Sequence, residues 1–441
     1  MNKVALHTLG CKLNFSETST IGNQFILKGF NIVDFKENAD VYIFNTCTVT
    51  GNAERECRQL VRRVLRQNPN AYIVVTGCYA QLRPDEISEI VGVDAVLGTK
   101  EKFKIFDLLN NFDKKNLACI HVSPNADLDD FGPAHSTDAD TRTRAYFKIQ
   151  DGCDYKCSFC TIPKARGSNR SMDPDSAVRE FKSLLNKGYI EIILTGVNVG
   201  DYGKAYNTDL YNLLLRLVEI PGNFRIRISS VEPNLLNDKI IELTASNEKM
   251  CKHFHVPLQS GSPKILKMMK RRYKVEDYKK LIDKLNTTIP EVGIGVDVIV
   301  GFPGETEDDF LDTYNFLRDL EISYLHVFTY SERPGTPAIA LPGQVDIFER
   351  KRRNNLLRDL SSRKKNLFYN KMIGRELNVL FETENHNGII KGFSSNYVRV
   401  AVPFNPDLVN TLAGVSINNS DNSVCTGELT AIKKSVDSLA S

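Results

Sequence analysis

The sequence lacks any apolar run long enough to cross a membrane. Its longest apolar stretch, near Val292–Phe302, is interrupted by Asp297, whereas a membrane helix needs about 20 consecutive apolar residues. The start, Met1–His7, lacks the basic, apolar and small-residue pattern of a secretory signal peptide. Internal repeats and low-complexity tracts are also missing. These absences disfavour membrane, secreted, fibrous and disordered proteins, and we expect a cytoplasmic protein without a membrane partner.

An excess of charge of one sign is missing too, because 57 Lys and Arg residues stand against 54 Asp and Glu residues. The net charge of +3 says nothing about partners, but its distribution does. Residues 350–375 contain ten basic residues and one acidic residue, and residues 264–284 contain nine basic residues against three acidic ones. Segments of this kind could neutralise the phosphate backbone of a nucleic acid.

The 441 residues suffice for about two to four domains. In the first 120 residues, three short apolar runs each precede a turn and a helical pattern. These runs are Val4–Thr8, Val41–Thr46 and Tyr72–Thr76. Strands that alternate with helices predict a parallel sheet with right-handed crossovers. Residues 123–143 carry five aspartates and little apolar periodicity, which favours a linker.

A second series of strands and helices begins at Ala145–Gln150 and predicts a closed or partly closed parallel barrel. After a basic helix around Arg350–Asn370, short strands separated by Gly, Asn and Ser predict a small antiparallel barrel. The expected strands are Ile190–Leu194, Phe224–Ser229, Phe254–Val256, Gly293–Val300 and Tyr324–Thr329 in the first barrel, and Glu376–Glu382, Gly388–Phe393, Tyr397–Val402 and Glu428–Ile432 in the second. We therefore expect an α/β protein with an amino-terminal domain (1–122), a linker (123–143), a partial barrel (144–370) and a carboxyl-terminal β-barrel (371–441).

The strongest chemical signal is a set of three cysteines, Cys153, Cys157 and Cys160, spaced C-x3-C-x2-C after the first strand of the parallel barrel. On one tight loop they can bind three irons of a [4Fe–4S] cluster and leave the fourth iron open to a substrate or cofactor. Zinc or unligated thiols are the alternative, but structural zinc normally has four protein ligands and no nearby His or Cys completes this set.

A second set of cysteines is dispersed, because Cys11, Cys47 and Cys78 each follow one of the three amino-terminal strands. Ligands gather outside the carboxyl ends of the strands of an open parallel sheet. Equivalent placement on three strands would bring these thiols together, although three buried structural cysteines would give the same pattern. Nearby, Asn14 followed by Glu17 resembles a capping box at the start of a helix.

The C-x3-C-x2-C motif, with the aromatic Phe159 before its last cysteine, resembles that of the radical S-adenosylmethionine (SAM) superfamily over roughly residues 145–365. The resemblance implies that the open iron binds SAM and that the reduced cluster cleaves it to a radical. It also implies SAM contacts at the ends of successive barrel strands. The residues that match are Phe159, Thr195, Gly196, Asn198, Ser229, Gln259 and Asp297. Apart from Phe159, these matched residues could equally be ordinary polar residues of loops at the strand ends.

Three blocks around the dispersed cysteines are similar to the signature blocks of the methylthiotransferase family, namely Thr8–Asn14, Asn45–Thr50 and Thr76–Gln81. Ile162–Gly167 fits the same family, and the expected small barrel resembles the RNA-binding TRAM domain. The resemblance covers nearly the whole chain. It implies that Cys11, Cys47 and Cys78 hold an auxiliary [4Fe–4S] cluster that carries or delivers the inserted sulfur.

The remaining signals have ordinary structural explanations. Four other cysteines, Cys57, Cys119, Cys251 and Cys425, have no motif around them and are expected to pack. The stripe Arg55, Arg58, Arg62 and Arg66 lines one helix face, which is usually solvated but could contact phosphate. Gly301–Thr306 reads as a tight turn before a helix. The seven histidines form no set with metal-ligand spacing.

The resemblance implies methylthiolation of carbon 2 of a tRNA adenosine next to the anticodon. That C–H bond is neither acidic nor electrophilic, so a radical from a cofactor must activate it. One SAM would methylate sulfur at the auxiliary cluster and a second would yield the radical. The anticodon loop presents the base at lower cost than a duplex would. An electron donor such as a flavodoxin or ferredoxin and a sulfur donor are further implied partners.

The cysteine blocks and Ala165–Gly167 look most like enzymes that act on N6-threonylcarbamoyladenosine at tRNA position 37. N6-isopentenyladenosine and a ribosomal-protein aspartate are alternative substrates, and a non-catalytic iron–sulfur protein that binds RNA or senses iron is an alternative of another class. A pocket for the carboxylate of threonylcarbamoyl needs a cation or several hydrogen-bond donors. Arg166 and Arg170 could supply it, or could instead make structural ion pairs or backbone contacts to tRNA.

Overall fold

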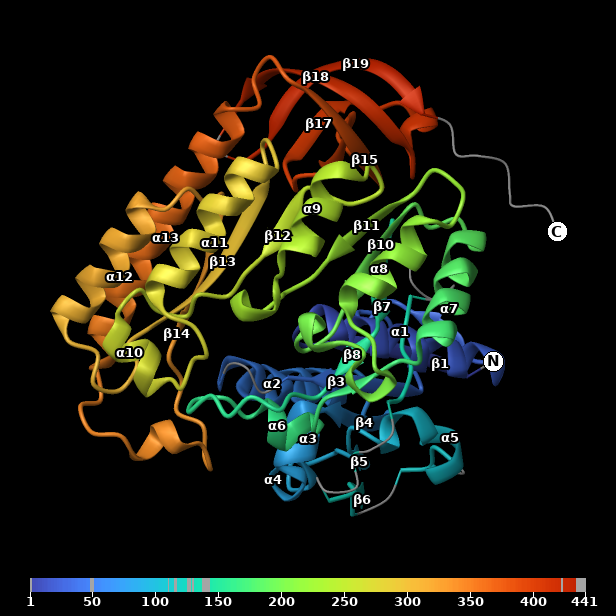
Figure 1. The fold of residues 1–441 in the computed structure, drawn as a ribbon. Helices are drawn as coiled ribbons and strands as arrows, with labels where there is room; N and C mark the ends of the chain where they lie inside the picture. Colours follow the sequence, from blue (N-terminus) through green and yellow to red (C-terminus); the bar gives the residue numbers. More distant parts are fainter. Residues whose placement is uncertain are drawn as a thin grey trace.

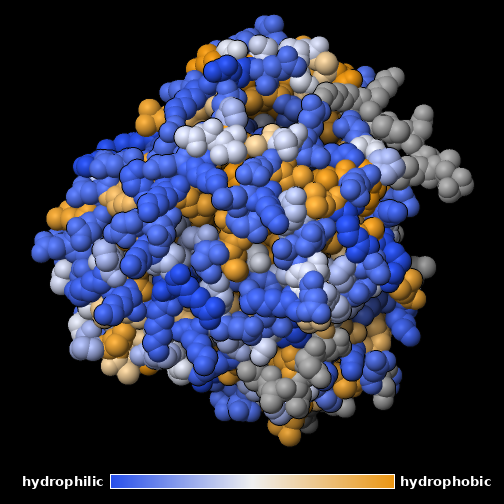
Figure 2. Space-filling view, in the orientation of Figure 1, coloured by the Kyte–Doolittle hydropathy of each residue, from blue (hydrophilic) through white to orange (hydrophobic). Residues whose placement is uncertain are grey.

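The computed structural model describes residues 2–47, 51–109, 111–114, 117–124, 128, 131–136, 143–421 and 423–433, without the side chains of 51–54 and 433. Thr48–Thr50 and much of the expected linker lie outside these residues. Figure 1 places the amino-terminal sheet (blue) and the carboxyl-terminal barrel (red) at opposite ends of the molecule, with the central barrel between them. In the described part, no helix is both long and apolar enough to cross a bilayer. The face in Figure 2 is mainly hydrophilic, with hydrophobic side chains in small groups.

The amino-terminal sheet has six parallel strands in the order β2-β1-β3-β4-β5-β6. Its two inner strands β3 and β4 are buried at every position, as apolar runs covered by helices on both faces should be. The strands are β1 (Lys3–Thr8), β2 (Asn31–Val33), β3 (Val41–Thr46), β4 (Tyr72–Gly77), β5 (Ala95–Leu97) and β6 (Cys119–His121). The helices are α1 (Lys12–Leu27), α2 (Gly51–Gln67), α3 (Cys78–Leu82), α4 (Pro84–Ser88), η1 (Glu101–Lys104) and α5 (Ile105–Leu108). The predicted parallel sheet is confirmed.

The expected capping box at Asn14 and Glu17 is wrong. Helix α1 begins at Lys12, its N-cap is Cys11, and Cys11 makes no side-chain capping bond. Asn14 and Glu17 lie one turn further on and are completely buried. Their side chains serve long-range contacts, because the amide of Asn14 donates to the carbonyl oxygens of Leu9 and Thr46, both at 3.1 Å.

The central barrel consists of two parallel three-stranded sheets, β11-β10-β7 and β12-β13-β14. Single bridges from Ile226 to Met250 and from Ser230 to His255 join them, and β7 and β14 remain the outer strands. The strands are β7 (Arg144–Lys148), β10 (Glu191–Thr195), β11 (Arg225–Ile228), β12 (His253–His255), β13 (Gly293–Val300) and β14 (Tyr324–Thr329). The helices are α6 (Ile162–Arg166), α7 (Pro174–Asn186), α8 (Leu210–Val218), α9 (Asp238–Ser246), α10 (Pro263–Met268), α11 (Val275–Thr288), α12 (Glu307–Asp319) and α13 (Ile347–Asn370). Two further short strands, β8 (Gln150–Asp151) and β9 (Arg170–Ser171), pair antiparallel on either side of α6. This is the predicted partial barrel.

Alternation along these strands divides the barrel into two faces. One face packs on the helices through residues such as Phe147, Leu194 and Val296, which belong to the central core. The opposite face lines a lumen, and its residues are strongly polar for a barrel interior. They include Arg144, Glu191, Arg227, His253, His255, Asp297, Tyr324 and His326. The lumen is therefore the place where the fold concentrates polar chemistry.

The carboxyl-terminal barrel is closed, in the order β15-β16-β17-β19-β18. Its strands are β15 (Glu376–His386), β16 (Ile389–Ser394), β17 (Arg399–Pro403), β18 (Leu412–Ser420) and β19 (Cys425–Lys433). This barrel packs against the strands of the lumen, because Arg225 and Arg227 donate hydrogen bonds to its carbonyl oxygens at Phe393, Ser394 and Ser395, at 2.7–3.1 Å. The small barrel thus closes one end of the central barrel.

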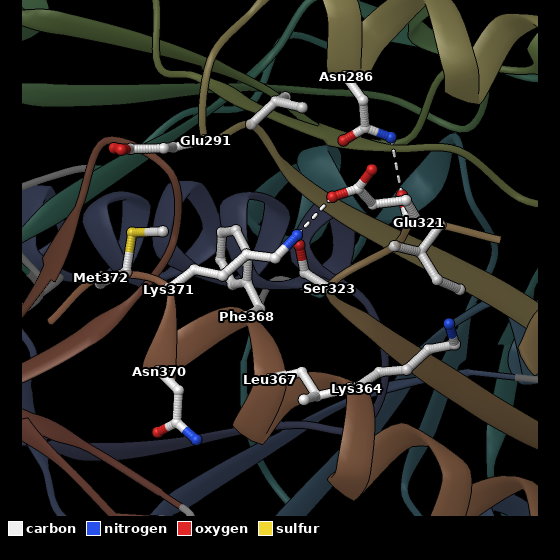
Figure 3. A pocket seen from close by; sticks show the side chains of 12 residues that line it. Asn286, Glu291, Glu321, Ser323, Lys364, Leu367, Phe368, Asn370, Lys371 and Met372 are labelled. Atoms are coloured by element: carbon white, nitrogen blue, oxygen red, sulfur yellow. Dashed lines mark hydrogen bonds and ion pairs between the residues drawn. The ribbon is translucent and has the colours of Figure 1, made fainter. Parts of the chain in front are cut away.

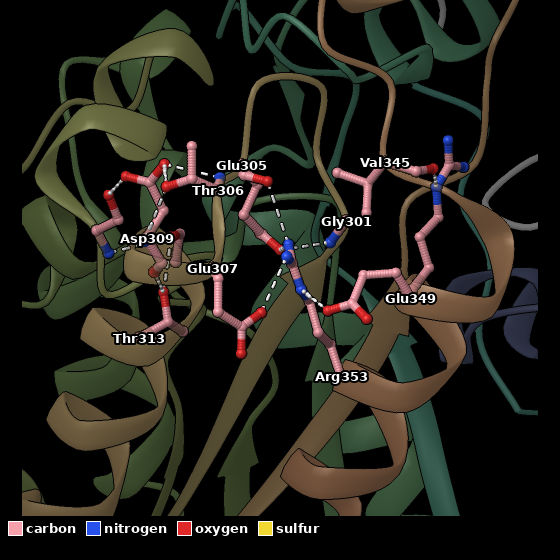
Figure 4. A network of polar contacts seen from close by, with 12 residues as sticks. Gly301, Glu305, Thr306, Glu307, Asp309, Thr313, Val345, Glu349 and Arg353 are labelled. Carbon is pink, nitrogen blue, oxygen red and sulfur yellow. Dashed lines mark hydrogen bonds and ion pairs between the residues drawn. The ribbon is translucent and has the colours of Figure 1, made fainter.

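Much of the basic segment 350–375 holds helix α13 in place. Arg353 is buried and pairs with Glu305 at 2.6 Å, Glu349 at 2.8 Å and Glu307 at 3.2 Å (Figure 4). Arg350 is buried as well and pairs with Glu332 at 2.6 Å. The expectation that this segment could neutralise a phosphate backbone is therefore wrong for Arg350 and Arg353, whose charges are already paired. Three basic residues of α13 are exposed and make no side-chain hydrogen bond or ion pair to a residue that the structure describes, namely Lys351, Arg358 and Arg363.

The turn at Gly301–Thr306 is structural, as expected. The Glu305 carboxylate accepts a hydrogen bond from the Gly301 amide at 2.9 Å (Figure 4), and Thr306 caps α12 in a capping box with Asp309. Burial raises the pKa of Glu305 even though Gly301 and Arg353 oppose that shift. The turn thus anchors α13 to the end of β13.

Candidate functional site

The first cysteine set lies on a loop that leaves strand β8 and enters α6. Backbone amides donate to two of the sulfurs, from Tyr155 to Cys153 and from Ile162 to Cys160, both at 3.4 Å. Burial raises the pKa of the Cys153 thiol to about 11 and that of Cys160 to about 12. A metal must therefore displace these protons, and a buried three-thiol loop with amide donors is suited to an iron–sulfur cluster.

A glycine fixes the start of this loop. Gly152 adopts φ +70°, and a Cβ there would lie 1.9 Å from the carbonyl oxygen of Ser168. The amide of Cys153 then donates to the carbonyl oxygen of Gly167 at 3.1 Å. Only glycine allows the backbone to pass this closely at a left-handed φ, so the position of Cys153 depends on Gly152.

One contact to these cysteines escaped the sequence analysis. Arg271 donates to the sulfur of Cys157 at 3.1 Å, is almost fully buried, and pairs with Glu232. Its guanidinium carbon also lies 5.1 Å from the centre of the Tyr273 ring. The basic segment 264–284 predicts a nucleic-acid contact for this residue, but the structure places it against a cysteine sulfur. The sequence holds no spacing signal that links Arg271 to a residue 114 positions away.

The second cysteine set meets at one edge of the amino-terminal sheet. Strands β1, β3 and β4 are neighbours, and Cys11, Cys47 and Cys78 follow them directly or within three residues. A Cβ at Gly10 would lie 2.6 Å from the Cβ of Cys47, so the loop before Cys11 touches Cys47. Burial raises the pKa of Cys78 while nearby Arg166 opposes this and the Cys11 thiol adds to it. The three thiols therefore share one location.

A buried ion network lies beside Cys78 and joins the two cysteine sets. Arg166 donates to Asn14 at 2.7 Å, to both oxygens of Glu17 at 2.9 and 3.1 Å, and to Asp151 at 3.1 Å. Lys102 and Lys148 complete it, with Lys102 2.6 Å from Glu17 and Lys148 2.8 Å from Asp151.

This network decides the role of Arg166. Four cations, with Arg170 included, face two carboxylates, so a surplus positive charge adjoins Cys78 and can compensate for thiolate charge. The side chain of Arg166 is 1% exposed, and all its contacts are made within the protein. The hypothesis that Arg166 faces a substrate carboxylate is therefore wrong, and the structural ion pair is correct. Arg170 also pairs with Asp151, at 3.6 Å.

Three of the residues matched to SAM contacts carry buried polar atoms without a hydrogen-bond partner in the described structure. They are the hydroxyls of Thr195 and Ser229 and both amide atoms of Asn198. Unsatisfied buried groups are costly and usually await a ligand. Gly196 lies between Thr195 and Asn198 and packs closely on Gln150, where a Cβ would be 2.7 Å from the amide oxygen. A polar cofactor such as SAM fits this row of donors and acceptors at the strand ends.

The other three matched residues behave differently. Phe159 packs in a small apolar cluster and meets Phe302 edge-on at 6.5 Å. Gln259 adopts φ +72° and pairs with β13 by backbone contacts. Asp297 lies within β13 rather than at its end, and its carboxylate already accepts from His255 at 2.7 Å. Gln259 and Phe159 remain predictions, whereas Asp297 has a protein partner.

The lumen also assembles a group that the sequence spacing concealed. His255, Asp297 and His326 come from β12, β13 and β14, and their ligand atoms lie within 4.8 Å of one another. His255 also shares a hydrogen bond with Ser230 at 2.7 Å. Parallel pairing of Asp297 with His326 explains why residues 29 positions apart in sequence meet.

A separate cavity of about 720 Å³ lies beside the end of α13, between the central and small barrels (Figure 3). Lys371 pairs there with Glu321, and Leu367, Phe368 and Met372 supply apolar walls. None of its lining residues is a cysteine or a matched SAM contact. This cavity is a seam between barrels rather than the chemical site.

The remaining candidates from the sequence are the four other cysteines and the arginine stripe of α2. Cys57 and Cys425 lie in apolar cores, Cys251 is buried, and Cys119 is half-buried. On α2, Arg58 bonds the Tyr79 hydroxyl at 3.2 Å, whereas Arg55, Arg62 and Arg66 are exposed.

Comparisons with known proteins match both halves of the site. Residues 147–317 match the radical SAM superfamily, and residues 3–98 match the uncharacterized protein family UPF0004. The threonylcarbamoyladenosine tRNA methylthiotransferase MtaB of Bacillus subtilis is 40% identical over 434 residues, 95% of this chain and 94% of that protein. The tRNA-2-methylthio-N(6)-dimethylallyladenosine synthase of Clostridium novyi is 34% identical over 440 residues, 96% of each.

Among solved structures, the radical SAM methyltransferase TsrM from Kitasatospora setae has a similar fold. Its TM-score is 0.56 at 18% identity, over 77% of this chain and 75% of that chain. This likeness supports the arrangement of sheets and helices.

Proposed function

The chain belongs to the radical SAM tRNA methylthiotransferase family, and we propose that its substrate is N6-threonylcarbamoyladenosine at tRNA position 37, methylthiolated at carbon 2. The observation that carries the choice of nucleoside is the ranking of relatives. Four relatives named for threonylcarbamoyladenosine are 40%, 40%, 37% and 36% identical, against 34% for the dimethylallyladenosine synthase. The chain is therefore an enzyme rather than a non-catalytic iron–sulfur protein.

SAM and a [4Fe–4S] cluster are the cofactors of this family, and Cys153, Cys157 and Cys160 are the residues that would hold that cluster. When bound, the pair supplies one-electron cleavage of SAM, which side-chain acid–base chemistry cannot provide. The chain's own part is to fix the thiols through Gly152 and the loop amides, and to place the cation of Arg271 on one sulfur. Thr195, Asn198 and Ser229 have free polar atoms that would orient SAM.

A second cluster would be held by Cys11, Cys47 and Cys78. Support comes from their shared location after three neighbouring strands and from the surplus positive charge of the Arg166 network beside Cys78. Three thiolates and a cluster carry negative charge, which a buried cation offsets. In this arrangement, residues 1–122 supply the sulfur site and residues 144–370 the radical site.

The tRNA partner would approach the exposed basic residues of α13, Lys351, Arg358 and Arg363, and the small barrel at residues 371–441. Charged side chains without protein partners release counterions when they meet phosphates. The reduction of the cluster and the sulfur supply need an electron donor and a sulfur donor, both external to the chain. We expect the anticodon loop to present its base toward the lumen between the two cysteine sets.

N6-isopentenyladenosine is the second candidate substrate, since the dimethylallyladenosine synthase aligns over 96% of this chain. Reconstituted, reduced enzyme should be assayed on anticodon stem-loops that carry either modification, with methylthiolated nucleoside quantified by mass spectrometry. We expect faster methylthiolation of the threonylcarbamoyl form. Replacing Cys11, Cys47 and Cys78 by Ala should stop sulfur insertion but spare SAM cleavage. Faster reaction of the isopentenyl form would overturn the assignment.

A further inference from the structure

The lumen of the central barrel is electropositive near the small barrel. Tyr397 of the small barrel reaches it and stacks near His253 at 4.7 Å, with the Arg227 guanidinium 5.0 Å from its ring centre. Burial alone would raise the pKa of the Tyr397 phenol, but Lys12, Arg144 and Arg227 outweigh burial and lower it. A buried phenol acquires a lowered pKa only where cations dominate the local field.

The cations at this position are not equally free. Arg227 pairs with Glu191 at 2.9 Å, and Arg144 pairs with Glu382 at 3.2 Å. Lys12, in contrast, has neither a hydrogen bond nor an ion pair to any residue that the structure describes, although it is only partly exposed. Burial, together with the nearby Arg227 and Arg144, lowers the pKa of Lys12, and buried ammonium groups are usually paired. Lys12 is therefore an ammonium group that a bound anion would stabilise.

The position of Lys12 relates it to the chemistry. It is the first residue of α1 and directly follows Cys11. Helix α1 lies over β7, where Phe15 stacks on Tyr146 of the lumen face at 6.5 Å. The Lys12 side chain therefore starts beside the second cysteine set, and its charge acts on both Tyr397 and His326 of the lumen.

His326 is the second uncommitted group of the lumen. Its side chain is exposed, and among the described residues it has ring contacts but no hydrogen bond, to Tyr324 at 5.2 Å and His255 at 5.3 Å. The other two lumen histidines are occupied, because His253 bonds the Tyr324 hydroxyl at 2.8 Å and His255 bonds Asp297 and Ser230. His326 thus offers a free ring nitrogen to a ligand.

We propose that Lys12 and His326 form an anion subsite in the lumen, and that it takes the carboxylate of the N6-threonylcarbamoyl group. This inference rests on the proposed function and deepens it. The subsite supplies a cation for the carboxylate, which Arg166 cannot do because its guanidinium is already paired in the buried network. The tyrosine and histidine rings of the lumen provide flat walls for the purine.

A metal ion on His255, Asp297 and His326 is the competing use of the same residues. Two features oppose it. The bond between His255 and Asp297 uses one ligand atom of each, and the surrounding Lys12, Arg144 and Arg227 repel a further cation. The same charges attract a carboxylate, so the anion is favoured.

The subsite also explains discrimination. An apolar isopentenyl group in this position would bury Lys12 without a counter-charge, which is costly. A site built for a charged partner rejects analogues that lack it by large factors. Selectivity would therefore reside in the lumen rather than in the loops that bind the tRNA backbone.

The test compares Lys12→Met, Lys12→Arg and His326→Phe with the wild type and with His386→Ala, an exposed histidine of the small barrel. We expect KM for the threonylcarbamoyl stem-loop to rise roughly 10- to 100-fold in Lys12→Met and His326→Phe, as for loss of a hydrogen bond to a charged group. Lys12→Arg should recover most of this affinity, because it keeps the charge. His386→Ala should match the wild type. Iron per chain, measured in each preparation, reports whether Cys11 still binds.

Two results separate the subsite from the proposed function. If the wild type prefers the threonylcarbamoyl form and both Lys12→Met and His326→Phe keep that preference at wild-type KM, the subsite is refuted while the function stands. If the wild type itself prefers the isopentenyl form, the function fails first. Supplementing Zn²⁺ should leave KM unchanged, and a Zn²⁺-dependent fall in KM would favour the metal instead.

Discussion

Replacing Arg166 by Met should destabilise the protein through the buried network rather than through substrate binding. The change removes four hydrogen bonds, to Asn14, Glu17 twice and Asp151, and leaves two carboxylates with less compensation in a site closed to water. Breaking a buried ion pair costs about 3–5 kcal/mol. We expect the lower end, about 3 kcal/mol, because Lys102 and Lys148 remain. With an unfolding entropy of about 2.1 cal/mol/K per residue, the midpoint of thermal unfolding should fall by roughly 3 °C if the chain unfolds as one unit.

The assay is thermal unfolding of Arg166→Met, Glu17→Gln and their double variant, with Arg179→Met as the control. Arg179 is exposed and, among the described residues, its side chain bonds only the Ser176 hydroxyl, at 2.7 Å. Its loss should therefore change stability by less than about 0.5 kcal/mol. The double variant should be less destabilised than the sum of the single variants, because each removes the other's partner. An Arg166→Met protein with wild-type stability and a selective loss of threonylcarbamoyl binding would refute this reasoning and return Arg166 to the substrate.

The other predictions use the same charges. Arg166, Lys102 and Lys148 outweigh burial and hold the pKa of Glu17 at about 2, against an ordinary 4.5. The contribution of Glu17 to stability is therefore complete above about pH 4.5 and disappears as the pH falls toward 2. Glu17→Gln should flatten the acid limb of a plot of unfolding midpoint against pH. Charge reversal at Arg358 and Arg363 should lower the salt-dependence slope of tRNA binding by about one unit per phosphate contact. Arg353→Glu, in contrast, should mainly lower the unfolding midpoint. An unchanged slope would show that α13 does not contact the RNA. Arg271→Met should lower the reduction potential of the cluster on Cys153, Cys157 and Cys160, measured by a spectroscopic redox titration, because it removes a cationic donor from the Cys157 sulfur; an unchanged potential would make Arg271 a packing residue.

The meeting of Cys11, Cys47 and Cys78 was predictable, because parallel strands bring their carboxyl ends to one edge. The short apolar runs between helical patterns likewise predicted the strands of the central barrel. Strand β18 was missed, since Leu412–Ser420 is rich in Gly, Asn and Ser and reads as a loop. Such residues are tolerated there because a closed barrel supplies every backbone partner.

Side-chain pairing at long range could not be predicted. Nothing in the sequence relates Arg166 to Glu17, 149 positions away. The apparent capping box at Asn14 and Glu17 was misleading, because these polar side chains bind Arg166 in the buried network instead of capping α1. The basic run at 350–375 reads as a nucleic-acid surface until α13 is placed against Glu305 and Glu307. The sequence shows how many charged residues a segment contains. Function depends on which of those charges remain unpaired after folding.

We propose that this enzyme methylthiolates N6-threonylcarbamoyladenosine in tRNA. The most direct measurement is mass spectrometry of tRNA nucleosides from cells with the protein, without it, and with the Cys153→Ala variant. We expect 2-methylthio-N6-threonylcarbamoyladenosine to disappear without the protein and with the variant. Its unthiolated precursor should accumulate, and 2-methylthio-N6-isopentenyladenosine should be unchanged. Loss of the isopentenyl product with the threonylcarbamoyl product intact would contradict this proposal.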